Sequence, residues 1–284
     1  MNLLSSAPVL PLRHNRLGET AHVFGDGLAG ILHQPSVAAD AAPAVILLNA
    51  GMVQRMGPYR GSVQLARALA ARGHPVLRFD HSGLGDSPVS ARPAPDLRLA
   101  EVRAAIDLLA THTGARRFVV GGICSAADVA FEAASVEPRI SGLLLLDGPC
   151  YRTIGWWWRH LLPRLADPAR IRRWWRARGR GEPQPSMADF RDFPARAEAR
   201  ARLRDLVARD VALLFVFTGG AYGYFNHARQ LVAAYGRPAR TPQVRLEYWP
   251  HCDHTFYLRR DRERLQDTVA TWLRDRFPAL HDVA

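Results

Sequence analysis

Short apolar runs alternate with amphipathic stretches along most of the chain. The runs predict buried strands, because each is brief and ends near glycine, asparagine or aspartate. They cover residues 44–49, 75–80, 117–121, 142–146, 211–217 and 243–248. Between them, apolar residues recur at helical spacing over residues 59–72, 97–112, 126–135, 228–235 and 262–277. Strands that alternate with helices over short connections predict an α/β fold with a mostly parallel central sheet flanked by helices.

The composition changes after Pro149. Residues 150–205 are rich in tryptophan and arginine, are broken by proline and glycine, and lie between two predicted strands. Aromatic, largely helical sequence inserted at this point predicts a helical lid, and an aromatic helix pair packed on the core is the alternative. We therefore expect one domain whose core comprises residues 1–149 and 206–284, with the lid at residues 150–205.

The charge of the chain excludes some kinds of chemistry. The net charge of +12 comes from arginine alone, because the 284 residues contain no lysine. Schiff-base and P-loop chemistry both need lysine and are therefore excluded. A basic surface attracts anionic partners, but no nucleic-acid-binding motif accompanies the charge. We interpret it as a solvated basic surface and expect no nucleic-acid partner.

Cysteine usage and hydropathy indicate the compartment. No run approaches the ~20 apolar residues of a membrane-spanning helix, and no cationic, apolar leader begins the chain. We expect a soluble, cytoplasmic protein without membrane contact. Cys124, Cys150 and Cys252 have unrelated spacings, which fits reduced thiols rather than a disulfide framework. Because no cysteine or histidine cluster has zinc spacing, we expect neither a metal nor another cofactor. No feature predicts an oligomeric state.

The segment Gly122-Ile123-Cys124-Ser125-Ala126 joins a predicted strand to a predicted helix. This is the setting of the nucleophile elbow G-x-S-x-G, here with cysteine as the nucleophile and alanine at the last small position. Small residues let the strand and the helix approach closely, and a strained turn presents the nucleophile. Cys124 is predicted to lie at the carboxyl edge of the sheet, where ligands bind in such folds. A buried, inert cysteine is the alternative.

A general base for this nucleophile is expected in the loop between the last strand and the last helix. That loop opens at the same edge of a parallel sheet as the elbow. It contains His251 and His254. The chain order of nucleophile, acid and then histidine favours a histidine at this place. We prefer His254 over His251.

Four ordered motifs resemble the serine aminopeptidase-like branch of the α/β-hydrolase superfamily. They are Asn49-Ala50-Gly51-Met52 with Gly57-Pro58, residues 79–87, the elbow at Cys124, and Asp253-His254-Thr255-Phe256, within a match from about Ala44 to Leu273. The resemblance implies an α/β-hydrolase fold with an inserted helical lid. It also implies an oxyanion hole formed by the backbone N–H groups of Ser125 and of Met52 or its neighbour Gly51. Residues 80–87 are implied to form a structural loop.

The chain departs from this family in two places. Cysteine replaces serine at the elbow, which resembles dienelactone hydrolase, a relative with a thiol there. After the strand at residues 211–217, where the family places its acid, Ala221 occupies the aligned position and no carboxylate is present. A thiol ionises more readily than a hydroxyl, so a Cys–His dyad depends less on an acid. Asp147, at the end of the strand after the elbow, is the preferred replacement, and Asn226 is the second candidate.

These residues predict acyl-transfer chemistry. In the leading hypothesis Cys124 attacks an ester or thioester carbonyl, His254 accepts and returns the proton, and water resolves the acyl-enzyme. The alternative enzyme is an acyltransferase or cyclase that takes a carrier-bound intermediate, with an acidic acyl carrier protein as the partner of the basic lid. A non-catalytic binding protein that lost its acid is the third hypothesis. Trp156, Trp157 and Tyr222 are the candidate contacts for a small-molecule acyl substrate.

Overall fold

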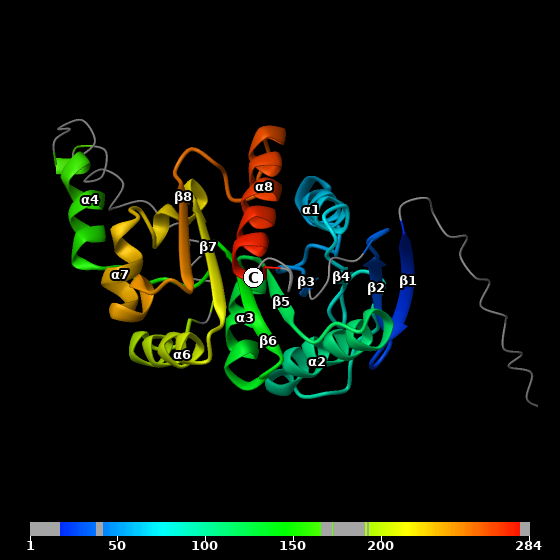
Figure 1. Cartoon of the computed structure of the whole chain (residues 1–284). Coiled ribbons are helices and arrows are strands. Elements are labelled where there is room, and N and C mark those ends of the chain that lie inside the picture. Colours follow the sequence, from blue (N-terminus) through cyan, green and yellow to red (C-terminus); the bar gives the residue numbers. More distant parts are fainter. Residues whose placement is uncertain (1–17, 38–41, 166–171, 173–190, 192, 279–284) are drawn as a thin grey trace, which may run out of the picture.

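An eight-stranded sheet forms the centre of the molecule, in the order β1-β2-β4-β3-β5-β6-β7-β8 (Figure 1). The computed structural model describes residues 18–37, 42–165, 172, 191 and 193–278. The strands are β1 (Glu19–Phe24), β2 (Leu28–His33), β3 (Ala44–Leu47), β4 (Val76–Phe79), β5 (Phe118–Ile123), β6 (Ile140–Leu146), β7 (Ala212–Thr218) and β8 (Val244–Trp249). β2 pairs antiparallel with both β1 and β4, whereas the pairs from β4 to β8 are parallel. The sheet is therefore mostly parallel, as the alternation of strands and helices predicts.

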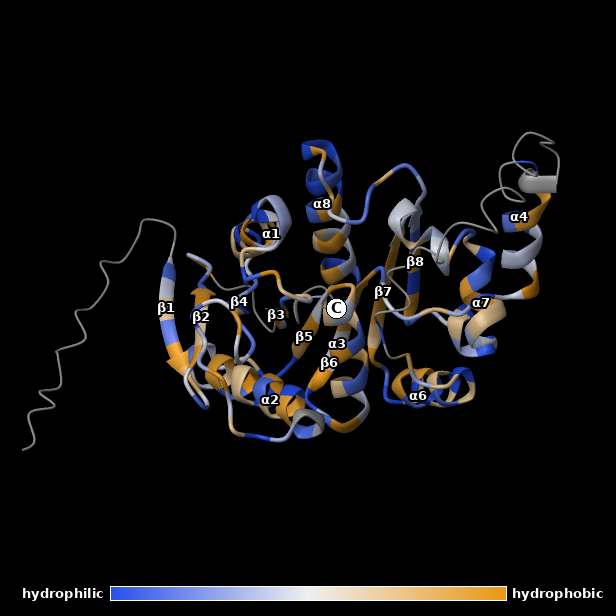
Figure 2. Cartoon of the chain, turned by 180° about the vertical axis from the view of Figure 1, so that it is seen from behind, coloured by the Kyte–Doolittle hydropathy of each residue, from blue (hydrophilic) through white to orange (hydrophobic). Residues whose placement is uncertain are grey.

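The two faces of the sheet bury different halves of each strand. Successive side chains of a strand point to opposite faces. In β6, Leu143 and Leu145 pack into one core, while Leu144 and Leu146 pack into the other. Because helices cover both faces, the strands are apolar at nearly every position and form continuous hydrophobic runs in the sequence. Figure 2 shows this concentration of hydrophobic residues in the central strands.

Helices lie on both sides of the sheet (Figure 1). On one side, α1 (Gly61–Ala70) packs beside α8 (Arg259–Arg276). On the other side lie α2 (Ala94–Thr113), α3 (Ser125–Val136), α6 (Arg196–Ala208) and α7 (Arg229–Tyr235). The remaining helices are α4 (Ile154–Leu165), which lies at the β8 end of the sheet, and the 3-10 turns η1 (Pro58–Arg60), η3 (Gly219–Gly223) and η4 (Arg237–Arg240). Among the described helices, none is long and apolar enough to cross a membrane.

The hydrophobic pattern locates the strands from β3 onward to within a few residues. It assigns no strand before Ala44 and therefore misses β1 and β2. The edge strand β1 is mostly exposed or half-buried and contains no apolar run, whereas β2 is largely buried. Of the predicted lid at residues 150–205, residues 166–171, 173–190 and 192 lie outside the described residues. The described part contains α4 and most of α6, and α6 continues to Ala208.

Candidate active site

Cys124 lies in a sharp turn between β5 and α3. Its φ of 58° and ψ of −124° are rare for a residue with a side chain, so the turn is strained. The backbone N–H of Cys124 donates to the carbonyl of Leu146 at 2.8 Å, which fixes the turn to β6. A Cβ added at Gly122 would lie 2.6 Å from the Cβ of Ala126, so only glycine fits where the strand meets the helix. These are the backbone features that the G-x-C-x-A pattern predicts.

His254 reaches back to this turn from the loop after β8 and is held by a buried carboxylate. Its Nδ1 lies 2.7 Å from Oδ2 of Asp147, which directly follows β6 and is fully buried. Thr218, the last residue of β7, donates its N–H and its hydroxyl to the two oxygens of the same carboxylate, each at 2.6 Å. Because Nδ1 faces the carboxylate of Asp147, Nε2 is the ring nitrogen left to act on the nucleophile. Cys124 and this ring line the same cavity, and each shifts the pKa of the other. The structure thus brings Cys124, His254 and Asp147 together.

The loop after β7, where the family places its acid, packs against the loop that carries His254. Ala221 is buried there within η3. A Cβ on Gly220 would lie 2.4 Å from the Cβ of His254, and one on Gly219 would lie 2.4 Å from the carbonyl oxygen of Pro250. The β7 loop therefore packs directly on the backbone of the histidine loop, and the carboxylate comes from the neighbouring strand β6.

The two other residues considered for the triad lie elsewhere. Asn226 accepts a hydrogen bond from Nε of Arg159 at 3.0 Å and donates to the carbonyl of Trp156 at 3.2 Å. Its amide thus joins α4 to the segment before α7 and does not orient His254. His251 is exposed at the start of the histidine loop. The structure selects Asp147 and His254 from the alternatives that the sequence leaves open.

A cavity of about 420 Å³ opens beside the triad and is lined by Cys124, His254 and residues of the segment after β3. None of the three predicted aromatic contacts lines it. Trp156 is buried and donates its indole N–H to the carbonyl of Tyr222 at 3.1 Å, so these two residues join α4 to η3. Trp157 is about half exposed. The apolar side chains that line this cavity are mainly aliphatic, so the role of the three aromatic residues as substrate contacts stays a prediction.

A model of the alpha/beta hydrolase fold matches residues 43–275. The chain belongs to the α/β-hydrolase family. An esterase of Pyrococcus furiosus superposes with a TM-score of 0.60 at 15% identity, over 91% of this chain and 90% of that one. A proline iminopeptidase of Mycobacterium smegmatis superposes with a TM-score of 0.56 at 19% identity, over 90% of this chain and 98% of that one. A lidless serine hydrolase of Xanthomonas campestris superposes with a TM-score of 0.53 at 15% identity, over 96% of this chain and 99% of that one. At these identities the likeness shows a shared fold. No curated protein matches the chain.

The charges around the elbow of this α/β-hydrolase favour an ionised pair. Burial raises the pKa of the Cys124 thiol, but the hydrogen bond from His254 and the positive charges of Arg191 and His254 outweigh it, so this pKa lies below its ordinary value. Burial lowers the pKa of His254, but its hydrogen bonds to Asp147 and Cys124 raise it to about 9. Both shifts favour the thiolate–imidazolium form of the pair over its neutral form.

Arg191 is the functional residue that sequence reasoning misses. It belongs to the inserted segment, and its guanidinium is almost fully buried. Nε and one Nη hold the carboxylate of Asp128 on α3, at 2.7 and 2.5 Å. The same guanidinium donates to the backbone carbonyls of Cys124 at 3.0 Å and Asp147 at 2.8 Å, and to the hydroxyl of Tyr224 at 3.0 Å. All five N–H donors are used. No motif marks this residue among the 38 arginines, because its role arises only where two distant loops meet.

The hydrogen bonds of the predicted oxyanion hole separate its two candidates in the segment after β3. The N–H of Gly51 donates to the hydroxyl of Ser125 at 3.0 Å, so this N–H is already engaged. The backbone N–H of Ser125 helps to lower the pKa of the Cys124 thiol, so it is close to the atom that would attack a carbonyl. Met52 follows Gly51 and lines the cavity. The N–H groups of Ser125 and Met52 are therefore the better pair of candidate donors for an oxyanion.

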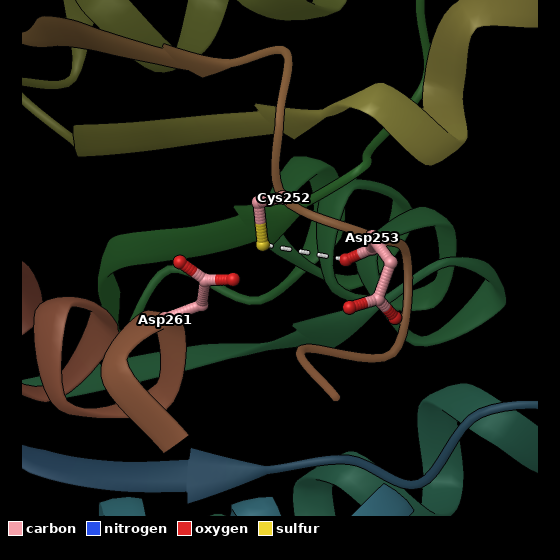
Figure 3. Close-up of side chains that lie close together, drawn as sticks. All are labelled: Cys252, Asp253 and Asp261. Carbon is pink, nitrogen blue, oxygen red and sulfur yellow. Dashed lines mark hydrogen bonds between the residues drawn. The ribbon is translucent and has the colours of Figure 1, made fainter. Parts of the chain in front are cut away.

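Cys252, Asp253 and Asp261 are the side chains, among the described residues, that lie close enough together to hold a metal ion (Figure 3). The thiol of Cys252 donates to the backbone carbonyl of Asp253 at 3.4 Å. The carboxylate of Asp253 accepts the N–H groups of Thr255 and Tyr257, each at 2.8 Å. These bonds stabilise the loop that carries His254, and they give the carboxylate of Asp253 hydrogen-bond partners within the protein.

Iodoacetamide is expected to modify Cys124 faster than Cys150 and Cys252 in the folded protein. Alkylation requires a thiolate, and burial raises the pKa of the other two thiols to about 12. Because the pKa of Cys124 is lowered, its alkylation rate should persist below the ordinary thiol pKa of ~8.5 and decline only at lower pH. Peptide mass spectrometry after timed labelling measures the three rates. Equal rates, or a Cys124 rate that rises only above the ordinary pKa, would contradict the ionised pair.

Proposed function

We propose that this α/β-hydrolase cleaves an ester or thioester through an acyl-enzyme on Cys124. The observation that carries the proposal is the placement of Cys124 and His254 beside one cavity, with the ring of His254 held at 2.7 Å by the carboxylate of Asp147. The order of the four sequence motifs further supports a place in the serine aminopeptidase-like branch of the family.

The proposed reaction has two halves. The thiolate of Cys124 attacks the carbonyl carbon, a C–S bond forms, and the carbonyl electron pair moves to oxygen. The N–H groups of Ser125 and Met52 donate hydrogen bonds to this oxyanion and stabilise its charge. When the tetrahedral intermediate collapses, the bond to the leaving alcohol or thiol breaks and His254 supplies its proton. His254 then takes a proton from water, which attacks the acyl carbon. The C–S bond breaks, and the free acid leaves with the thiolate restored.

The position of Asp147 supports this proposal over a binding protein that has lost its chemistry. That hypothesis depended on the missing carboxylate at Ala221. Here a carboxylate hydrogen-bonds the histidine, and its remaining acceptors are held by Thr218. Acyl transfer to an alcohol, amine or thiol shares the first half of the reaction and differs only in the acceptor, so it stays the alternative function.

Intact-protein mass spectrometry tests the proposal. The protein is mixed with p-nitrophenyl esters, N-acetylcysteamine thioesters and acyl carrier protein thioesters, and is quenched with acid at short times. We expect an increase equal to the mass of the acyl group, located on the peptide that contains Cys124, and free acid as the product. Release of free acid with the adduct on Cys150 or Cys252, or the absence of any adduct and product, would contradict the proposal. Transfer to an added amine or thiol in place of water would favour the acyltransferase.

A further inference from the structure

The cavity beside Cys124 continues into the layer between the sheet and the helix pair α1 and α8. Its lining includes Leu47, Leu144 and Leu146, whose side chains point to the α1 and α8 face of the sheet. Leu65 of α1 and Leu265 of α8 line it from the helices. Cys124 thus lies at one side of the cavity, and leucine side chains line the side between the sheet and the two helices.

Apart from the pair Cys124 and His254, the charged side chains of the lining are two arginines that bind other parts of the protein. Among the described residues, no aspartate or glutamate lines the cavity. Of its two arginines, Arg191 uses all five donors within the protein. Arg262 donates through Nε to Gln64 at 3.0 Å and through Nη1 to the carbonyls of Phe256 and Tyr257. The two arginines are thus turned to partners within the protein, and burial of an apolar chain against the leucines is the favourable interaction that the cavity offers.

We propose that this cavity binds the acyl chain of the substrate, and that the chain is uncharged, aliphatic and about eight to twelve carbon atoms long. This inference rests on the proposed function and names its substrate class. Burial of the hydrocarbon against the leucines supplies the binding free energy, while the carbonyl lies at Cys124.

The volume sets the length of the chain. A cavity of ~150 Å³ encloses one benzene ring of six carbon atoms. At about 420 Å³, this cavity has room for nearly three such rings. Because the reacting carbonyl and its leaving group occupy the part at Cys124, the rest holds a chain on the order of a dozen carbon atoms. The entrance also suits an apolar ligand, since Met52 and Val53 line the cavity and are 87% and 41% exposed.

Gly61, the first residue of α1, provides a direct way to shorten the cavity. It lines the cavity and has helical φ and ψ of −59° and −43°, so a side chain there causes no backbone strain. A Cβ added to Gly61 would meet only Cδ of Arg262, at 3.8 Å. Larger side chains at this position extend into the space between α1 and α8. Gly61→Ala and Gly61→Leu therefore form a graded series that leaves the triad untouched.

The test is the dependence of kcat/KM on chain length, measured with straight-chain N-acetylcysteamine thioesters from acetyl to hexadecanoyl. In the wild-type protein we expect a rise of about fourfold for each added methylene, up to about ten carbons, and a plateau or fall beyond. In Gly61→Leu, the maximum should move to a chain about four carbons shorter, and the ratio of kcat/KM for decanoyl to acetyl should fall about 250-fold. Gly61→Ala should shift the maximum by about one carbon.

Ala68→Leu is the matched control, because it adds a similar volume to α1 at a residue that does not line the cavity. It should leave the chain-length profile of the wild type unchanged. A flat profile with activity on all esters, or a profile that Gly61→Leu does not alter although thermal unfolding shows it to be folded, would overturn the acyl cavity while the thiol hydrolase stands. Absence of activity and of a Cys124 adduct with every chain length would overturn the proposed function itself.

Discussion

Cys124→Ala is expected to lower kcat/KM for ester or thioester hydrolysis by about 10⁵-fold. Without the sulfur no acyl-enzyme forms, and His254 retains only the capacity to activate water. The remaining rate should come from the oxyanion donors and from substrate binding. Steady-state kinetics with a decanoyl thioester, together with intact-protein mass spectrometry, measure the loss of turnover and of the adduct.

Cys150→Ala is the matched control for this substitution. Cys150 follows β6 closely, as Cys124 follows β5, and it is fully buried with a pKa raised to about 12 by that burial. It lies outside the lining of the cavity, so its removal should leave kcat/KM within about twofold of the wild type if the protein remains folded. Retained turnover in Cys124→Ala, or an equal loss in the two variants, would reject Cys124 as the nucleophile.

Asp147→Asn is expected to lower kcat/KM by about 10²- to 10⁴-fold. All three hydrogen bonds to this carboxylate come from donors: two from Thr218 and one from His254. An asparagine amide cannot accept all three, because one of its two ends donates. The histidine would lose its orienting acceptor and the negative charge that helps to stabilise the imidazolium.

The pH profile separates this role from a purely structural one. Asp147 and Cys124 together raise the pKa of His254 to about 9, so the protonated ring that the leaving group needs is lost as the pH rises through that value. In Asp147→Asn the pKa of His254 should fall, and the alkaline limb of kcat should move to lower pH. Thr218→Val is the matched control, because it removes one hydroxyl donor and keeps the charge. It should cost less activity and leave the alkaline limb near its wild-type position. An unchanged limb in Asp147→Asn would contradict the proposed pair.

The strands from β3 onward, the elbow and the histidine loop follow from local sequence. Buried parallel strands are continuous apolar runs, so the strands at residues 44–49 and 211–217 can be recognised from the sequence. The elbow is a matter of neighbouring residues, because the close approach of Gly122 to Ala126 and the turn at Cys124 lie within one short segment. His254 needs only one further assumption, that loops after parallel strands open at the same edge.

Only the tertiary structure decided which acid orients the histidine, what holds the elbow and where the cavity lies. Asp147 and His254 are 107 residues apart, and Arg191 is 67 residues from the backbone carbonyl of Cys124 that it binds. The cavity lies between α1 and α8, which come from opposite ends of the domain and meet on one face of the sheet. The reason is physical. Local sequence encodes periodicity and turn geometry, whereas hydrogen bonds and cavities between loops depend on which strands and helices lie side by side in the folded chain.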